Sequence, residues 1–198
     1  QSVAEILPEF SGKRPIRPYE NPLQSNDLVT VSDQTGEIDA GKITFYDLLT
    51  HQSGLPAWRP LFRQADREEA RRMALQTFFS YPTGTRIVYS DIGLILLGMA
   101  MERVTGEQLD RTIHKEIVLP LGLQRTRYYR LPQGKQLSQH KVAVNVAPTE
   151  LCKWRQRRVA AEVHDENAAR LGGVSGHAGL FSTARDVARL GQMFLDNG

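Results

Sequence analysis

The sequence predicts a mainly α-helical structure with long connecting loops, and three observations lead to this expectation. Residues 91–104 carry apolar side chains at helical spacing, and residues 66–79 form a second amphipathic stretch. Residues 11–40 are rich in Pro, Gly, Asn and Ser, which is typical of a long loop or an insertion. Of the 198 residues, 40% are hydrophobic and 24% charged, as in ordinary globular domains, so we expect a single domain over residues 1–198.

The first third of the chain is expected to contain only short elements. Residues 2–8 are predicted to be the end of a helix that Pro8 stops. A short strand is predicted at residues 28–31. Thr44 is predicted to cap a short helix that runs through Thr50, because an acidic residue stands three positions after it.

The middle of the chain is predicted to contain two longer helices. Asp66 is expected to cap the first, over residues 66–79. Asp91 is expected to cap the second, over residues 91–104, and Gly106 to end it as a C′ glycine.

The last third is predicted to alternate between helices and irregular chain. Residues 107–117 are expected to be helical and residues 124–160 irregular. A short helix is predicted near Asp165, and a final helix from Thr183 to about Asp196.

Tyr89-Ser90-Asp91 is the most informative short motif, because it stands directly before the helical run and after the turn Pro82-Thr83-Gly84. A tyrosine and a carboxylate two positions apart at a helix start project from one rigid corner. A serine acyl-transferase can hold its second catalytic group in this way. The alternative is a core tyrosine beside a helix cap, since short motifs often occur by chance.

Three longer segments, in order, carry a family resemblance: residues 44–56 (TFYDLLTHQSGLP), 89–106 (YSDIGLILLGMAMERVTG) and 164–190 (HDENAARLGGVSGHAGLFSTARDVARL). Together they resemble the serine β-lactamase-like family of class C β-lactamases, penicillin-binding proteins, DD-peptidases and esterases. The third segment is most similar to the penicillin-binding-protein 4B-like subgroup. The resemblance implies an α/β β-lactamase/transpeptidase-like fold, of which this chain would be the helical lobe, with most of the antiparallel sheet missing.

The resemblance also implies that the chain is an internal fragment of a larger hydrolase. The family's Ser-x-x-Lys nucleophile box precedes the first segment, and its Lys/His-Thr-Gly box follows the third. Ser138-Gln139-His140-Lys141 formally fits the first pattern, but it lies in a polar stretch that would not desolvate the lysine, and it follows the tyrosine box. We therefore expect the fragment alone to be inactive.

By this resemblance, the reaction is acyl transfer to serine followed by hydrolysis, without a metal or organic cofactor. Tyr89 matches the family's catalytic tyrosine, which serves as base or acid. Asp91 stands where many members carry Asn. An ionised Asp only accepts hydrogen bonds and would repel a substrate carboxylate, which weakens a β-lactamase assignment more than an esterase or peptidase assignment.

Residues expected to line the substrate pocket are His177, Ala178, Gly179 and Trp58. The segment from Gly172 to Gly179 has too many glycines for a helix or strand, and it predicts a tight loop or a close backbone approach. In the family this region borders the active-site groove. Trp58 could equally be a core or rim aromatic residue.

Two other polar groups are interpreted as structural. His51 and Ser53 could form a catalytic pair, but at this spacing we expect them to satisfy the backbone of a tight turn. His164-Asp165-Glu166 could bind a metal, but adjacent side chains on a helix start point in different directions, so we expect capping and loop anchoring instead.

Composition sets limits on partners. The net charge is +3, with basic clusters at residues 67–72 and 153–158, but no nucleic-acid-binding motif is present, so we expect no nucleic acid and instead a small-molecule or peptidoglycan-derived substrate. No apolar run is long enough to span a membrane.

The resemblance to a truncated family member leads to further expectations. Homo-oligomerisation through the faces that truncation exposes is one of them. The resemblance also favours a bacterial periplasm or cell envelope over the cytoplasm. The alternative to an enzyme is a non-catalytic binding or regulatory module that kept the family's groove.

Overall fold

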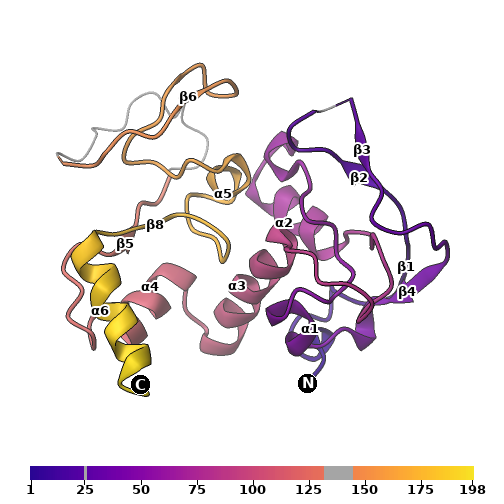
Figure 1. The fold of residues 1–198 in the computed structure, drawn as a ribbon, viewed down its shortest axis with the longest axis horizontal. Helices are drawn as coiled ribbons and strands as arrows, with labels where there is room; N and C mark the ends of the chain where they lie inside the picture. Colours follow the sequence, from indigo (N-terminus) through magenta and orange to yellow (C-terminus); the bar gives the residue numbers. More distant parts are fainter. Residues whose placement is uncertain (25, 132–144) are drawn as a thin grey trace.

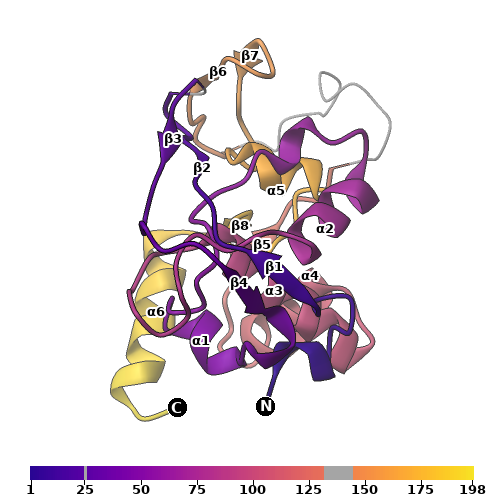
Figure 2. The same ribbon diagram turned by 90° about the vertical axis from the view of Figure 1, so that its right-hand side faces the viewer.

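The fold is built around one buried helix, α3 (Asp91–Thr105), as the computed structural model shows in Figure 1. The structure describes residues 1–24, 26–131 and 145–198. Helices α1 (Phe45–Leu49) and α2 (Arg67–Leu75) pack against α3, and α5 (Glu166–Arg170) lies beside α2 (Figures 1 and 2). The main core gathers apolar side chains of α3 with residues of the first eighty positions, among them Val3, Phe10, Leu48, Leu55, Leu61 and Phe79.

The segment 11–40, expected to be one long loop, instead contains two small antiparallel sheets. Strand β1 (Lys13–Pro15) pairs with β4 (Glu37–Asp39), and β2 (Tyr19–Glu20) pairs with β3 (Leu28–Val29). The strand predicted at residues 28–31 is therefore present but shorter. Strands of two or three residues carry too little period-2 alternation to be recognised against a background of Pro and Gly.

The helix predicted over residues 2–8 is reduced to one 3-10 turn, η1 (Val3–Glu5). Pro8 restricts the residue before it to extended backbone, so the turn cannot continue toward it. By contrast, α1 (Phe45–Leu49) forms as predicted. Thr44 accepts a hydrogen bond from the Asp47 amide, and the Asp47 carboxylate accepts one from the Thr44 amide, which completes a capping box.

Helix α2 (Arg67–Leu75) begins at the predicted cap, Asp66, but ends four residues before the predicted end at residue 79. Phe79 instead belongs to extended chain beside β1, where its amide donates to the Pro15 carbonyl at 3.0 Å. Both Phe78 and Phe79 are buried there. Tertiary packing therefore overrides the helical periodicity at this end.

The first basic cluster supports the packing of α2 on α3. Arg71 forms an ion pair with Glu102 of α3 at 2.9 Å, and Arg72 pairs with Glu69 within α2. Two short 3-10 turns precede these helices: η2 (Ala40–Lys42) comes before α1, and η3 (Leu61–Arg63) lies between α1 and α2.

The N-cap of helix α3 is Ser90, one residue before the predicted cap, Asp91. Asp91 is instead the first helical residue. Gly106 ends the helix with φ of 69°, as predicted for a C′ glycine.

The last third combines short helices and two-residue strands. Helix α4 (Leu109–Ile113) continues into a π-helical turn, η4 (His114–Val118), and β5 (Arg127–Tyr128) pairs with β8 (Leu180–Phe181). The segment expected to be irregular also contains the hairpin of β6 (Leu151–Cys152) and β7 (Arg157–Arg158). Ser138 and Lys141 lie outside the described residues.

The two predicted C-terminal helices are present. Helix α5 (Glu166–Arg170) is capped by Asp165, and α6 (Ala184–Leu195) is capped by Thr183. Both termini of the chain lie at the lower end of the molecule in Figures 1 and 2. Among the described residues, no helix has the length and apolar character that crossing a bilayer requires.

Candidate active site

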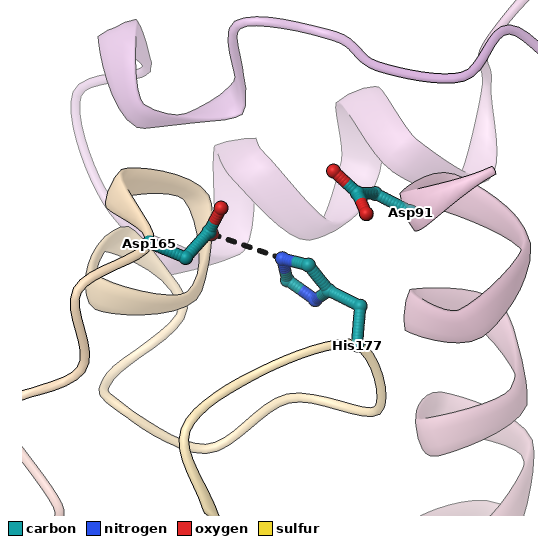
Figure 3. A group of neighbouring side chains, drawn as sticks. All are labelled: Asp91, Asp165 and His177. Atoms are coloured by element: carbon teal, nitrogen blue, oxygen red, sulfur yellow. Dashed lines mark hydrogen bonds and ion pairs between the residues drawn. The ribbon is translucent and has the colours of Figure 1, made fainter. Parts of the chain in front are cut away.

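Residues from two distant parts of the sequence meet at the N-terminus of α3. Asp91 comes from α3, Asp165 from the cap of α5, and His177 from the glycine-rich loop (Figure 3). The His177 Nε2 atom lies 2.9 Å from the Asp165 Oδ1 atom. One carboxylate oxygen each of Asp91 and Asp165 and one ring nitrogen of His177 all lie within 4.8 Å of one another. In Figure 3 the imidazole ring lies between the two carboxylates.

The corner that carries Tyr89 and Asp91 is fixed by Ser90. The Ser90 hydroxyl donates to the Pro56 carbonyl at 2.7 Å and accepts from the Gly93 amide at 3.2 Å. The Asp91 amide donates to the Ala57 carbonyl at 2.9 Å. Because the Ser90 side chain caps the helix and also anchors the 56–57 segment, Tyr89 and Asp91 project from a backbone that is held on both sides.

The tight turn at His51 supports the same corner. His51 has a φ of 57°, and its Nδ1 atom accepts from the Ser90 amide at 3.4 Å. Ser53 is buried and its hydroxyl accepts from the Leu55 amide at 3.3 Å. The His51 ring packs on the Tyr89 ring at a centroid distance of 4.9 Å. These two polar residues therefore satisfy backbone groups and support Tyr89.

The glycine-rich loop packs directly on α3. A Cβ atom on Gly176 would lie 2.1 Å from the Leu94 carbonyl oxygen of α3, so only glycine fits at this approach. Gly173 and Gly179 have φ values of 84° and 111°. The loop is thus both tight and in close backbone contact, as its composition predicts, and this contact places His177 opposite Asp91.

His177 is held at both ring nitrogens. Its side chain is 2% exposed, and Nδ1 lies 2.9 Å from the Ser175 hydroxyl. Asp165, the partner of Nε2, also accepts from the Ala168 amide at 2.7 Å and so caps α5. The sequence predicts helix capping and loop anchoring for Asp165, without a partner for the anchoring, and no role for Ser175. The only available signal was that both residues fall in one family-like segment with His177.

Burial and neighbouring charges shift the pKa values at this site. Burial, with the adjacent Asp91 carboxylate, raises the pKa of Tyr89 above its usual 10. Burial also raises the pKa of Asp91, and Asp165 adds to this while His177 opposes it. For Asp165, burial is outweighed by hydrogen bonds from His177 and from the Ala168 amide, so its pKa is lowered.

The remaining predicted pocket residues have packing contacts. The Trp58 ring contacts Phe62 at a centroid distance of 6.3 Å. Ala178 packs against a small apolar cluster that includes Val163 and Ala168. A Cβ on Gly179 would lie 2.4 Å from the Gly173 carbonyl, so Gly179 closes the loop on itself. A substrate-lining role for these three residues stays a prediction.

A cavity of about 870 Å³ lies elsewhere, between α2 and α3, and it is lined by residues that include Arg67, Arg71, Glu102 and Arg103. Its lining mixes both charge signs and already contains the ion pair of Arg71 with Glu102. We place the candidate site at Tyr89, Asp91 and His177 instead, because nucleophilic and proton-transfer chemistry requires converging titratable groups.

In the part of the chain that the structure describes, two groups of side chains carry atoms that could coordinate a metal ion: Asp91, Asp165 and His177, and separately Glu150, Cys152 and Glu166. In the first group both ring nitrogens of His177 already have hydrogen-bond partners, Ser175 and Asp165. Hydrogen bonding therefore accounts for the His177 ring, and the expectation of no metal stays a prediction.

Comparison with known proteins identifies the family. Residues 9–198 match the family model described as Beta-lactamase, so the chain belongs to the β-lactamase family. It is 37% identical over 182 residues to an N-acetylmuramyl-L-alanine amidase of Bacillus subtilis, covering 84% of this chain and 41% of that protein. It is 35% identical over 189 residues to a putative D-alanyl-D-alanine carboxypeptidase of Escherichia coli, covering 84% of this chain and 42% of that protein. The chain thus spans less than half the length of these relatives.

Solved structures agree on the fold. FmtA from Staphylococcus aureus superposes with a TM-score of 0.60 at 17% identity, covering 99% of this chain and 44% of that chain. An octameric penicillin-binding protein homologue from Pyrococcus abyssi gives a TM-score of 0.53 at 24% identity, covering 80% and 36%. The described architecture is therefore part of a β-lactamase-like fold.

Proposed function

We propose that the gene product containing this chain is a serine hydrolase that cleaves amide or ester acyl bonds through a serine acyl-enzyme. The observation that carries the proposal is the rigid corner at the start of α3, where Tyr89 and Asp91 project beside the pair of buried His177 and partly exposed Asp165. In this proposal the nucleophilic serine and its lysine come from sequence outside this chain, as does most of the antiparallel sheet. The chain alone is then inactive.

Tyr89 is proposed to transfer a proton at the acyl centre. Its pKa is raised here by burial and by Asp91, so within this chain the phenol stays protonated at neutral pH and can donate to a leaving group. To act as a base it would need cationic neighbours that stabilise the phenolate. The lysine contributed by the rest of the protein would supply that charge.

Asp91 is proposed to select against acyl donors that carry a carboxylate close to the scissile bond. An ionised carboxylate only accepts hydrogen bonds and repels a like charge. An amide at the same position both donates and accepts hydrogen bonds and carries no net charge. The name of one relative, an amidase, supports an amide substrate derived from peptidoglycan. A carboxypeptidase cleaves beside a terminal carboxylate, so the name of the other relative supports amide cleavage but not this selectivity. Small carboxylic esters are the simplest probes for the same chemistry.

The test is an assay of the natural-length gene product with a p-nitrophenyl ester and with nitrocefin, beside the variant Tyr89→Phe. We expect turnover of the ester that falls about 100-fold or more in the variant, because a positioned proton donor typically contributes this much. Tyr46→Phe is the matched control, because Tyr46 is an exposed tyrosine of α1. Turnover that survives in Tyr89→Phe would demote Tyr89 to a structural residue, and absence of any turnover would favour a binding module.

A further inference from the structure

His177 links two sequence segments that are otherwise separate parts of the site. Its Nε2 atom contacts the cap of α5, Asp165, and its Nδ1 atom contacts Ser175 of its own loop, each at 2.9 Å. Since both nitrogens are engaged and the side chain is 2% exposed, the ring has one orientation. That orientation places it between Asp165 and Asp91 (Figure 3).

Two carboxylates approach the His177 ring, and no lysine or arginine side chain is paired with either of them among the described residues. Asp165 is partly compensated by the Ala168 amide at the start of α5. The other titratable groups nearby are Tyr89 beside Asp91, His51 packed against Tyr89, and His164 next to Asp165. The His177 ring is therefore the side chain that separates the two carboxylates.

We propose that His177 is a positioning residue: its ring separates the Asp91 and Asp165 carboxylates and so keeps Asp91 beside Tyr89. The inference rests on the proposed function and deepens it. A neutral amide at position 91 would not be repelled by Asp165, whereas a carboxylate at that position is, so only the carboxylate depends on this separation. Asp165 and Ser175 serve by fixing the ring.

A double-mutant cycle on the natural-length gene product tests this. The variants are His177→Gln, Asp91→Asn and the combination, with His114→Gln, an exposed histidine of η4, as the matched control. We expect His177→Gln to lower kcat for the ester about 10-fold or more, with KM changed less. In the Asp91→Asn background the same substitution should change kcat by less than about 3-fold, because neighbouring residues that act on each other are not additive.

If His177 were purely structural, His177→Gln would lower kcat by the same factor in the wild-type and Asp91→Asn backgrounds, and that result would overturn the inference. An unchanged kcat in His177→Gln alone would also overturn it. The proposed function can fail separately, through absent turnover or an unaffected Tyr89→Phe variant. In that case the same cycle is measured by thermal unfolding. His177→Gln should then lower Tm more in the wild-type background than in the Asp91→Asn background, and equal Tm losses would overturn the inference.

Discussion

Asp165 combines two tasks that are usually separate, because the same carboxylate oxygen caps α5 and accepts from His177. Hydrogen bonds to an ionised carboxylate favour that form, which is why its pKa is lowered in spite of burial. A lowered pKa in the folded state means that the unfolded chain binds the proton more tightly. The stabilising contribution is thus present above the unfolded pKa, near 4, and is lost as pH falls through the folded value.

We therefore expect Asp165→Asn to lower the free energy of unfolding by about 1.5–3 kcal/mol near neutral pH, the range for hydrogen bonds to charged groups. The difference from wild type should shrink as pH falls below about 4. Urea unfolding at several pH values measures this, with Asp33→Asn, an exposed acidic residue, as the control. A difference that stays constant with pH would show that the ionised carboxylate is not the stabilising form.

At the scale of elements, the contact between α3 and the glycine-rich loop determines whether His177 faces Asp91. Gly176 lies against the Leu94 carbonyl, and a Cβ there would approach to 2.1 Å, which no side-chain adjustment can relieve because the obstacle is backbone. The loop would have to move away from α3, and His177 would move with it.

Gly176→Ala is accordingly expected to destabilise the protein by about 1–3 kcal/mol, as overpacking typically does, and to reduce ester turnover in the natural-length gene product. In the isolated chain, Gly191→Ala is the matched control for stability, because Gly191 lies in α6 with no atom within 4 Å of its would-be Cβ. That control should be neutral or stabilising by up to about 1 kcal/mol through helix propensity. Equal stability of both variants would mean that the loop does not pack on α3 as described.

The same elements show what the sequence could and could not predict. Capping residues are local signals, so Thr44, Asp66, Thr183 and Gly106 marked helix ends correctly. Ser90 was missed as the cap of α3 because Asp91 has equal capping propensity, and only the Pro56 carbonyl distinguishes them. The pairing of Asp165 with His177 was also missed, since contact across a folded loop leaves no periodic pattern.

At the scale of the whole molecule, α6 is attached mainly through polar contacts. Asp186 accepts from the Arg125 amide and from Thr126, and Arg189 donates to the Gly122 carbonyl. The apolar residues Val187 and Phe194, seven positions apart and so on one helix face, are 56% and 72% exposed. An apolar face of this kind is typical of an interaction surface. Under the proposed function, the remainder of the β-lactamase-like fold covers it.

If the rest of the fold covers this face of α6, the same substitution should have different effects in the isolated chain and in the natural-length gene product. In the isolated 198-residue chain, Phe194→Glu should reduce self-association and binding of the dye ANS, because it removes exposed apolar surface. In the natural-length gene product the same substitution should lower the free energy of unfolding by about 2 kcal/mol or more, since it places a charge where a phenylalanine is buried. Light scattering and urea unfolding provide the two measurements.

Leu23→Glu is the control. Leu23 is 90% exposed in the N-terminal part of the chain, so this substitution should leave the stability of both proteins unchanged. If Phe194→Glu were neutral in the natural-length protein, the face of α6 would be free there, and the remaining fold would have to pack elsewhere.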